Sequence, residues 1–367
     1  MRIRRPPDFV LLLTLLLLLG LGIVMVFSST LWFATLPPFN DTFFFLRRQL
    51  IWALIGLAAM FLMMNYDYWR LKRWAGLLLV CGIALLVVVL IPGVGVSRLG
   101  AQRWLNLGPL SFQPAEFVKL CLVVFTACGL SRQLDKLKNF WSGVLPYIAL
   151  AGLSAGLILL QPDLGTAVTV VGTIFIMLFA AGVQISNLAI VGLLGTGAIG
   201  LAIWHEPYRL RRFLAFLDPE KDPAGAGWHI LNSLMSLGSG GLLGTGLGQG
   251  HAKYLWVPER HTDFIFAIIG EELGFIGAAF VILLFILFIW RGFRVAVTSP
   301  DSFGTLLAAG IVAGIAVQVI INIGVVTSTL PITGITLPFI SFGGSSLVFS
   351  LASVGILLNI SRYSVYK

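Results

Sequence analysis

The chain has 367 residues, of which 58% are apolar and only 11% charged, and its mean hydropathy is +0.98. Soluble domains average about 45–50% apolar and roughly 25% charged residues, so this composition excludes an ordinary soluble domain and predicts a polytopic membrane protein. The net charge of +9 does not indicate nucleic-acid binding, because the basic residues are scattered at helix ends rather than gathered on one surface.

The apolar run behind the N-terminus is long. Arg2, Arg4 and Arg5 precede about twenty predominantly apolar residues that begin near residue 9. The core of a signal peptide has about 7–15 apolar residues, so this run predicts a retained first membrane span.

Ten segments have the length and polarity of a membrane span, which needs about 20 predominantly apolar residues. They predict helices at 9–28, 48–65, 75–92, 114–130, 143–160, 164–181, 188–204, 262–290, 303–327 and 341–360. The predicted fold class is an all-α polytopic membrane protein with about ten transmembrane helices, forming one domain over residues 1–367. An even number of spans places both termini on one side, with a long loop, 205–261, between the seventh and eighth helices.

The distribution of basic residues predicts which side is cytoplasmic, because cytoplasmic loops carry an excess of Lys and Arg. On the side of the N-terminus lie Arg2, Arg4, Arg5, Arg70, Lys72, Arg73, Arg132, Lys136, Lys138, Arg291, Arg294, Arg362 and Lys367. The short loops on the other side carry Arg47, Arg48, Arg98 and Arg103. We therefore expect both termini in the cytoplasm and the loop 205–261 outside.

The loop 205–261 differs in composition from the spans and contains all four histidines of the chain. Its first part mixes aromatic and aliphatic residues with Arg209, Arg211 and Arg212, which predicts a segment in the membrane interface with its arginines toward lipid phosphates. The alternative is a basic loop at the end of a helix. The glycine-dense run 238–250 permits tight turns, but no strand precedes it, so it is not a dinucleotide-binding fingerprint.

The segment 257–274 concentrates ionisable side chains at the start of the eighth predicted span. It carries Glu259, Arg260, His261, Asp263, Glu271 and Glu272. Carboxylates at the mouth of a membrane helix are costly to place there and by default mark a functional site. Glu271 lies about 12 Å deeper than Asp263 at 1.5 Å per residue, and Glu272 falls on nearly the opposite face. We interpret these two as polar contacts to neighbouring helices and Asp263 as the functional carboxylate.

Asp263 also has a purely structural alternative. A carboxylate at a helix start can cap the free backbone N–H groups, although Thr262 is an equally plausible cap and would leave Asp263 free. Below Asp263 runs a stripe almost without side chains, formed by Ala267, Gly270, Gly274 and Gly277. Such a stripe either packs closely against another helix or forms one wall of a groove for a lipid tail.

Two further groups of charged residues lie near predicted spans. Glu116 and Lys119 are one helical turn apart, and either neutralise each other or leave the lysine to receive an anionic headgroup. Arg103 precedes them in the same block. Asp163 follows a break between two spans at Gln161-Pro-Asp-Leu-Gly165, where capping of the next helix is its structural alternative.

The segment Leu330-Pro-Ile-Thr-Gly-Ile-Thr-Leu-Pro-Phe-Ile-Ser-Phe-Gly-Gly-Ser-Ser346 interrupts the apolar pattern before the last span. Irregular backbone at membrane depth is tolerated only where protein or a water-filled cavity surrounds it. We therefore expect it to lie against the same outward-facing cavity as Asp263, with Ser345 and Ser346 capping the last helix.

Five blocks of the chain recur together in one known family. They are Arg103-Trp with Phe112-Gln-Pro-Ala-Glu-Phe-Val-Lys119, Gln161-Pro-Asp-Leu-Gly165, Gly246-Leu-Gly-Gln-Gly250, Pro258-Glu-Arg-His-Thr-Asp-Phe-Ile-Phe266, and Leu330-Pro-Ile-Thr-Gly334 with Ser341-Phe-Gly-Gly-Ser-Ser346. In this order they resemble the SEDS family of shape, elongation, division and sporulation proteins (FtsW, RodA and SpoVE), over nearly the whole length. The FtsW/SpoVE branch fits better than RodA. The chain departs from the family pattern at Trp228-His229, Asn232-Ser233 and Ala115, but not in the block around Asp263.

The resemblance implies a peptidoglycan glycosyltransferase that polymerises lipid II at the outer face of the bacterial cytoplasmic membrane, with Asp263 as the catalytic residue. The implied partners are a class B penicillin-binding protein, other divisome or elongasome membrane proteins, and no nucleic acid. No cofactor is required by the motifs, although a divalent cation (Mg²⁺ or Mn²⁺) could assist the pyrophosphate. The candidate substrate-binding residues are Arg103, Glu116, Lys119, Asp163, Lys253, Glu259, Arg260, His261, Thr262, Ser345 and Ser346.

Two other functions fit a polytopic protein with broken helices and buried charges. One is a lipid II flippase or transporter, which should carry polar groups along the whole path across the membrane. The candidate residues cluster instead near one face, which favours chemistry there. The other is a non-catalytic scaffold for the penicillin-binding protein.

Overall fold

The structure, a computed structural model, describes residues 5–98, 101–107, 110–225, 227–254, 257 and 259–364. Some residues used to predict the orientation lie outside the described residues: Arg2, Arg4, Lys367 and the side chain of Arg98. Pro258 also lies outside them. The described chain consists mainly of helices, with one small sheet.

All ten apolar segments predicted to be helical form helices. Their bounds are α1 (Phe9–Thr30), α2 (Phe44–Asn65), α3 (Leu71–Leu90), α4 (Pro114–Arg132), α5 (Leu145–Leu159), α6 (Leu164–Ala180), α7 (Ile185–His205), α10 (Ile265–Val297), α11 (Ser302–Val326) and α12 (Gly344–Ser361). Within the described residues, nine helices are long and apolar enough to cross a membrane, when α5 is counted together with the helical turn before it as Phe140–Leu159; α6, with 17 residues, is slightly shorter. The all-α polytopic fold is confirmed.

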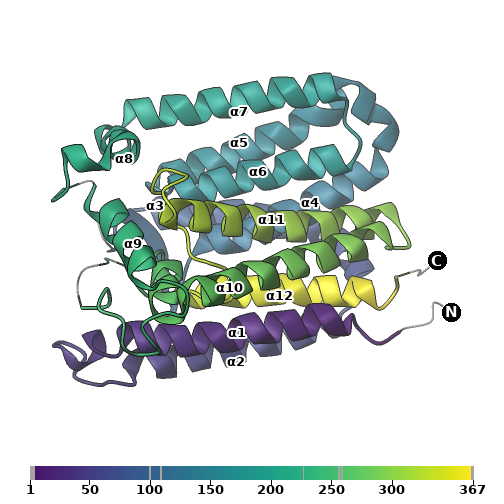
Figure 1. Cartoon of the computed structure of the whole chain (residues 1–367). Coiled ribbons are helices and arrows are strands. Elements are labelled where there is room, and N and C mark those ends of the chain that lie inside the picture. Colours follow the sequence, from purple (N-terminus) through teal and green to yellow (C-terminus); the bar gives the residue numbers. More distant parts are fainter. Residues whose placement is uncertain are drawn as a thin grey trace.

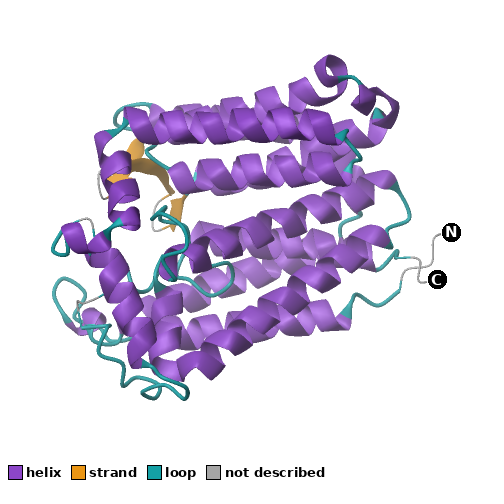
Figure 2. Ribbon diagram, turned by 45° about the horizontal axis from the view of Figure 1, so that its top comes forward, coloured by secondary structure: helices purple, strands orange, loops and turns teal. Residues whose placement is uncertain are grey.

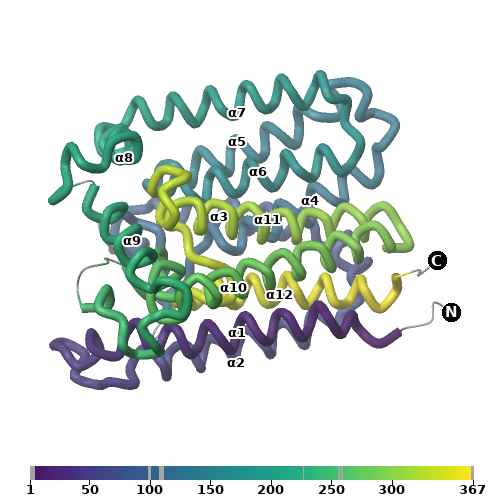
Figure 3. The backbone as a smooth tube through the Cα atoms, viewed as in Figure 1, coloured from purple at the N-terminus to yellow at the C-terminus, as the bar shows by residue number. Residues whose placement is uncertain are grey.

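The long helices run side by side, with both termini at one end of the bundle (Figure 1). The most enclosed is α11, since 78% of its spanning window is buried, against 11% for α7. α11 is therefore the central helix, and α7 lies along the rim (Figure 3). Short helical turns connect these elements at η1 (Phe33–Thr35), η2 (Tyr68–Arg70), η3 (Leu134–Lys138), η4 (Phe140–Val144) and η5 (Pro219–Lys221).

A small antiparallel sheet, which the sequence analysis did not anticipate, lies between α3 and α4 at the end of the bundle opposite the termini (Figure 2). Its strands are β1 (Gly95–Arg98), β2 (Ala101–Leu107) and β3 (Leu110–Phe112), in the order β1-β2-β3. The strands are short, and a register irregularity lies between Val96 and Ser97. No clear alternation of apolar and polar residues therefore marks them in the sequence.

The predicted loop 205–261 contains two helices, α8 (Pro207–Leu217) and α9 (Trp228–Ser239). α8 coincides with the arginine-containing segment for which an interfacial position was predicted. α9 was not anticipated. It lies beside the start of α10 (Figure 1), where Ser236 Oγ donates to the Ala267 carbonyl at 3.2 Å.

Helix α10 is broken at Gly274, whose φ of +68° and ψ of −169° are not helical. The glycine-rich segment 241–246 restores the backbone hydrogen bonds there. Thr245 N donates to the Glu271 carbonyl (2.9 Å), and Phe275 N donates to the Gly241 carbonyl (2.9 Å). Because a backbone with positive φ at this position favours glycine, the break in the helix explains why Gly274 occurs in the stripe of small residues below Asp263.

The stripe below Asp263 is a packing surface rather than the wall of a groove. A Cβ added at Gly270 would lie 2.4 Å from Leu237 Cδ2 on α9, and one added at Gly274 would lie 2.3 Å from Gly244 N. Contacts below 3.0 Å essentially never occur for real Cβ atoms, so both positions admit only glycine without local rearrangement. Of the two alternatives, the structure therefore supports close packing.

Glu271 and Glu272 make buried polar contacts to neighbouring elements, as predicted. Glu272 accepts from Ser28 Oγ of α1 (2.5 Å) and pairs with Lys253 Nζ (3.1 Å). Glu271 accepts from the backbone N–H of His251 (2.6 Å) and from Ser236 Oγ of α9 (3.5 Å). Through these contacts the two carboxylates hold the residues after the glycine-rich segment, together with α9 and α1, onto the first turns of α10.

Candidate active site

α10 begins at the end of the bundle opposite the termini (Figure 1), and Asp263 lies in the turn immediately before it. The N-cap residue is Phe264, and no side chain caps the helix, so the capping alternatives for Asp263 and Thr262 are both excluded. The Thr262 hydroxyl instead donates to the Glu259 carboxylate at 2.9 Å. The Asp263 carboxylate is half-buried, and among the described residues it makes no hydrogen bond or ion pair.

The surroundings of Asp263 raise the pKa of its carboxyl to about 7. Burial is the largest cause and the charges of Glu259 and Asp163 add to it, whereas Arg103 and Arg212 act in the opposite direction. A carboxylate with a pKa near neutrality is a stronger base than an ordinary aspartate, yet is still largely ionised slightly above pH 7. The fold thus brings Asp163, Arg103 and Arg212, from three distant segments, into electrostatic range of Asp263, in addition to the neighbouring Glu259.

The irregular segment 330–343 lies against Asp263, as the sequence predicted. It leaves the end of α11, loops outward and returns to α12 (Figure 3). Gly334 has a φ of +74°, and a Cβ added to it would lie 3.4 Å from Asp263 Oδ2. Ser341 Oγ donates to the Thr262 carbonyl at 2.5 Å. The segment therefore packs against both the carboxylate and the turn that carries it.

Two amide side chains on the central helix α11 hold these segments together. Asn322 Nδ2 donates to the Asp263 carbonyl (2.8 Å) and to the Ile335 carbonyl (2.6 Å). One turn away, Gln318 Nε2 donates to the Thr336 carbonyl (3.0 Å). The sequence analysis missed both residues. The sequence feature that could have identified them is a pair of amide side chains four residues apart, and thus on one helix face, in an otherwise apolar span.

Asp163 caps α6 and also pairs with Arg103. Its Oδ1 accepts from Thr166 N at 3.0 Å, which confirms the capping alternative. Its Oδ2 lies 3.5 Å from Arg103 Nη1 and accepts from Gln113 Nε2 at 3.4 Å. Arg103, on β2, also donates to the Gln161 carbonyl at 2.9 Å and to the neighbouring carbonyl of Pro162. The guanidinium is fixed by these contacts before any ligand binds.

A cavity of about 360 Å³ lies beside this arrangement. Its lining includes Arg103, Arg209, Arg212, Tyr208, Glu206 and Thr333. Arg212 is exposed and makes no ion pair among the described residues, whereas the Thr333 hydroxyl is buried without a hydrogen-bond partner. We call this space the arginine cavity.

The interfacial prediction for the arginines of α8 is wrong for Arg209. This side chain is buried, and it donates to the carbonyls of Leu159 and Ala202, both at 3.1 Å, so it anchors α8 to α5 and α7. Arg209 and Arg212 both line the arginine cavity with Arg103, but Arg209 is held by these two carbonyls, whereas Arg212 is exposed. The sequence indicated the cluster of arginines, but packing decided which of them is anchored and which is exposed.

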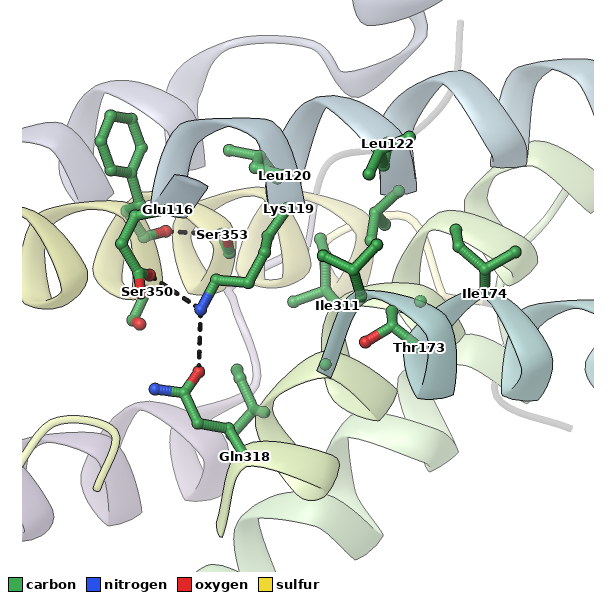
Figure 4. Close-up of a pocket in the computed structure, with 16 residues that line it drawn as sticks. Glu116, Lys119, Leu120, Leu122, Thr173, Ile174, Ile311, Gln318, Ser350 and Ser353 are labelled. Atoms are coloured by element: carbon green, nitrogen blue, oxygen red, sulfur yellow. Dashed lines mark hydrogen bonds and ion pairs between the residues drawn. The ribbon is translucent and has the colours of Figure 1, made fainter. Parts of the chain in front are cut away.

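Glu116 and Lys119 form an ion pair of 2.9 Å near the start of α4, the first of the two alternatives (Figure 4). Lys119 Nζ also donates to Gln318 Oε1 at 3.1 Å. A small cavity of about 60 Å³ adjoins the pair and is otherwise lined mainly by apolar side chains of α4, α6, α11 and α12. Through Gln318, the ion pair is connected to the segment 330–343.

Glu259, Arg260 and His261 belong to a turn that packs partly on aromatic rings. His261 lies within 5.1 Å of the Phe45 ring centre, and burial lowers the pKa of its imidazole to about 4. His261 is therefore neutral at pH 7. The Arg260 guanidinium lies over the Phe33 ring at 4.9 Å, and Glu259 contributes to the raised pKa of Asp263.

Three other candidate residues have structural partners. Lys253 is buried in the ion pair with Glu272. The prediction that Ser345 and Ser346 cap α12 is wrong, because the N-cap is Gly343 and no side chain caps this helix. Both serines lie in the first turn, where Ser345 Oγ accepts from Gln113 N (3.3 Å) and Ser346 Oγ lies 3.4 Å from the Thr336 hydroxyl.

The positions on α9 that depart from the family pattern differ in what they contact. Ser233 Oγ donates to the Val326 carbonyl of α11 at 2.8 Å and holds α9 against that helix, whereas Asn232 Nδ2 donates within α9, to the Trp228 carbonyl at 2.8 Å. The His229 ring stacks on Phe264, next to Asp263, with centres 5.8 Å apart. Burial and the charge of Arg212 lower the pKa of His229, so a neutral ring adjoins the site.

Across the described ranges, no three His, Cys, Asp or Glu side chains converge closely enough to hold a metal ion. The cationic side chains that line the arginine cavity are Arg103, Arg209 and Arg212.

Comparison with known proteins identifies the family of this fold. Residues 9–366 match the FtsW/RodA/SpoVE family model, described as "Cell cycle protein". Stage V sporulation protein E of Bacillus subtilis (strain 168) is 48% identical over 361 residues, covering 98% of each chain. A "Probable peptidoglycan glycosyltransferase FtsW" of Geobacter sp. (strain M18) is 43% identical over 354 residues, covering 96% of each chain.

Solved structures agree with this result. A chain from a structure described as "Structural coordination of polymerization and crosslinking by a peptidoglycan synthase complex" has a TM-score of 0.80 and 32% identity, covering 97% of this chain and 98% of that one. The rod shape determining protein RodA of Thermus thermophilus has a TM-score of 0.72 and 30% identity, covering 98% of each chain. The resemblance found in the sequence is thereby confirmed, and this chain belongs to the FtsW/RodA/SpoVE family of polytopic membrane proteins.

Proposed function

We propose that this chain is a peptidoglycan glycosyltransferase that polymerises lipid II into glycan strands at the outer face of the bacterial cytoplasmic membrane. Relatives named as probable peptidoglycan glycosyltransferases over nearly the whole length support this activity. The observation that carries it for this chain is Asp263. Its carboxylate is half-buried, has a raised pKa, has no hydrogen-bond or ion-pair partner among the described residues, and lies within electrostatic range of Arg103 and Arg212.

Asp263 serves as the general base in this proposal. Its carboxylate takes the proton of the acceptor hydroxyl as that oxygen forms a bond to the anomeric carbon of the donor sugar. The bond from this carbon to the phosphate oxygen breaks, and its electron pair leaves with the polyprenyl pyrophosphate. A single displacement of this kind converts an α-linked donor into a β-linked product. The pyrophosphate is already a good leaving group, so no acid is required to protonate it.

The arginine cavity is the place for the pyrophosphate. Charge-assisted hydrogen bonds from guanidinium groups stabilise the negative charge that develops on the leaving group. Arg103 is already fixed by Asp163 and by two carbonyls, so it contributes a preorganised charge. Arg212 is exposed and forms no ion pair with the part of the chain that the structure describes, so its guanidinium can rotate onto phosphate oxygens.

The cellular setting follows from the same comparisons. The solved relative from a synthase complex that couples polymerisation and crosslinking supports a class B penicillin-binding protein as the partner. Both termini lie at one end of the bundle, and the short connections at that end carry basic residues such as Arg70, Arg73 and Lys136. By the positive-inside rule, in which long loops weigh little, this supports cytoplasmic termini and Asp263 at the outer face.

Purified protein tests this proposal directly. Lipid II supplied in detergent, with and without a cognate class B penicillin-binding protein, should yield glycan strands. Assays of lipid II translocation and polymerisation in reconstituted vesicles distinguish the glycosyltransferase from the flippase and the non-catalytic scaffold. Translocation of lipid II without polymerisation would support the flippase, and absence of polymerisation even with the partner would support the scaffold.

The rate of polymerisation should depend on pH through Asp263. The base acts only when deprotonated, so kcat/KM should rise tenfold per pH unit below a pKa of about 7 and level off above it. The measurement is initial rate against pH at fixed ionic strength. A profile already flat from about pH 5 upward would show an ordinary aspartate pKa of about 3.9 and contradict the assigned environment.

Asn322 should act as a positioning residue for Asp263. Asn322→Leu removes the donor that ties the Asp263 carbonyl to the carbonyl of Ile335. A misplacement of about 1 Å can cost roughly 100-fold in rate, so we expect kcat to fall by about 10- to 100-fold with little change in KM. Steady-state kinetics on lipid II separate the two parameters.

The matched control for Asn322→Leu is Gln318→Leu. Gln318 holds the same segment through Thr336 but does not contact Asp263. If both variants lose kcat equally, stability of the segment rather than the position of Asp263 is limiting, and the assignment to Asn322 fails.

A further inference from the structure

A second cavity lies at the opposite end of the bundle from Asp263. It has a volume of about 680 Å³ and lies between the turn before α3 and the last turn of α4. Four basic side chains line it: Arg70, Lys72, Arg73 and Arg132. Tyr66, Trp69 and Trp74 complete the lining. We call it the basic interface cavity, and we propose that it binds the phosphodiester headgroup of an anionic glycerophospholipid.

The charges in this cavity are not balanced by the protein. Lys72 lies 3.8 Å from Asp301, and Arg70 lies 3.9 Å from Asp67. Arg73 and Arg132, both exposed, have no acidic partner among the described residues. Two unpaired guanidinium groups from different helices thus face one space, which a phosphodiester can bridge with charge-assisted hydrogen bonds.

Asp301 does not supply the missing negative charge. Its carboxylate already accepts from the hydroxyl of Tyr68 (2.7 Å), from Trp69 Nε1 (2.8 Å) and from the N–H of Gly304 at the start of α11 (3.1 Å). The carboxylate is therefore already engaged, and Asp301 does not line the cavity. Arg73 and Arg132, both exposed, are available to an external anion.

The aromatic and apolar surroundings favour a lipid over a soluble anion. Tryptophan and tyrosine are enriched at the level of lipid headgroups, and three such rings line this cavity. Trp74, Leu77 and Cys81 are exposed and share one face of α3 that runs from the cavity toward the middle of the bundle. A lipid bound by its phosphate at Arg73 would lay an acyl chain along this face.

The location also fits the leaflet in which this end of the bundle lies. The cavity is at the end that carries both termini, which the positive-inside rule places in the cytoplasm. Basic pockets between transmembrane helices on that side bind anionic headgroups, and each basic residue near the surface adds attraction to anionic lipid. Lipid binding at this cavity is independent of the chemistry proposed for Asp263.

Native mass spectrometry of the full chain in detergent tests the inference. Phosphatidylglycerol should bind with at least about tenfold higher affinity than phosphatidylcholine, and Arg73→Gln/Arg132→Gln should remove that preference. Arg73→Lys/Arg132→Lys, which keeps both charges, should retain most of it. This second variant keeps the test valid should the glutamine variant fold poorly.

The matched control neutralises two other basic residues at the same end. Lys136 and Lys138 are exposed and do not line the cavity. Lys136→Gln/Lys138→Gln should leave the preference for phosphatidylglycerol intact. Equal loss in this control would show a diffuse charge effect and overturn the site. The proposal of a lipid ligand would be refuted if millimolar inorganic phosphate fully displaced phosphatidylglycerol. It would also be refuted if the unmodified chain showed no preference for phosphatidylglycerol over phosphatidylcholine.

Discussion

Replacing Asp263 with asparagine should reduce lipid II polymerisation by about 10²- to 10⁴-fold, the usual contribution of a general base. Asparagine has nearly the same shape but cannot accept the proton of the acceptor hydroxyl. The carboxylate makes no hydrogen bond or ion pair among the described residues, so the substitution removes no folded-state contact of that group. The measurement is the yield of glycan strands per unit time from purified protein and lipid II.

The stability of the Asp263→Asn variant separates chemistry from folding. Since burial raises the pKa of this carboxyl, ionised Asp263 is destabilised in the folded protein at pH above 7, and asparagine removes that cost. Thermal unfolding of the variant should therefore occur at the same temperature or a slightly higher one. Polymerisation at an undiminished rate would refute the base assignment. A large drop in unfolding temperature would instead show a structural role.

Replacing Lys253 with methionine should destabilise the fold by about 3–5 kcal/mol, because it leaves a buried carboxylate without its counter-charge. The side chains of Lys253 and Glu272 are 3% and 0% exposed, and their Nζ and Oε1 atoms lie 3.1 Å apart. Ser28 alone would then donate a side-chain hydrogen bond to Glu272. The free energy of unfolding in detergent, followed by thermal or chemical denaturation, measures the loss.

Two companion variants make the Lys253 experiment specific. The double variant Lys253→Met/Glu272→Gln removes both charges and should recover much of the stability, since the cost comes from the unpaired charge. Lys221→Met breaks the exposed pair with Asp218, whose side chains are 81% and 44% exposed, and should change stability by less than about 1 kcal/mol. Full stability in the single variant would mean that water or another group satisfies Glu272.

The hydrophobic pattern was sufficient to predict the spans. All ten apolar segments are helices, because a backbone in lipid must satisfy its own hydrogen bonds and a run of about 20 apolar residues leaves few alternatives. The capping role of Asp163 was likewise visible locally, since a carboxylate directly before a helix finds its N–H groups within three residues. The five motif blocks, in their order along the chain, also indicated the family, which the comparisons confirm.

Side-chain partners across the bundle were not visible in the sequence. Lys253 was a candidate for substrate binding, but the glycine-rich segment folds back and buries it against Glu272. Ser345 and Ser346 looked like caps, whereas Gly343 takes that position and the hydroxyls face other segments. Local spacing gives the position of a residue along its helix, but the helix rotation and the neighbouring chain decide what it contacts.

The composition and order of residues thus determined a ten-helix membrane bundle and the carboxylate Asp263 at one end of it. Only the tertiary structure decided what surrounds that carboxylate. Asn322 on α11, 59 positions away along the chain, donates to the Asp263 backbone carbonyl, and the charge of Arg212 on α8, 51 positions away, acts on the carboxylate. Its pKa of about 7 depends on burial and on charges from three such segments. Electrostatic energies depend on distance and local polarity, and the fold alone fixes both.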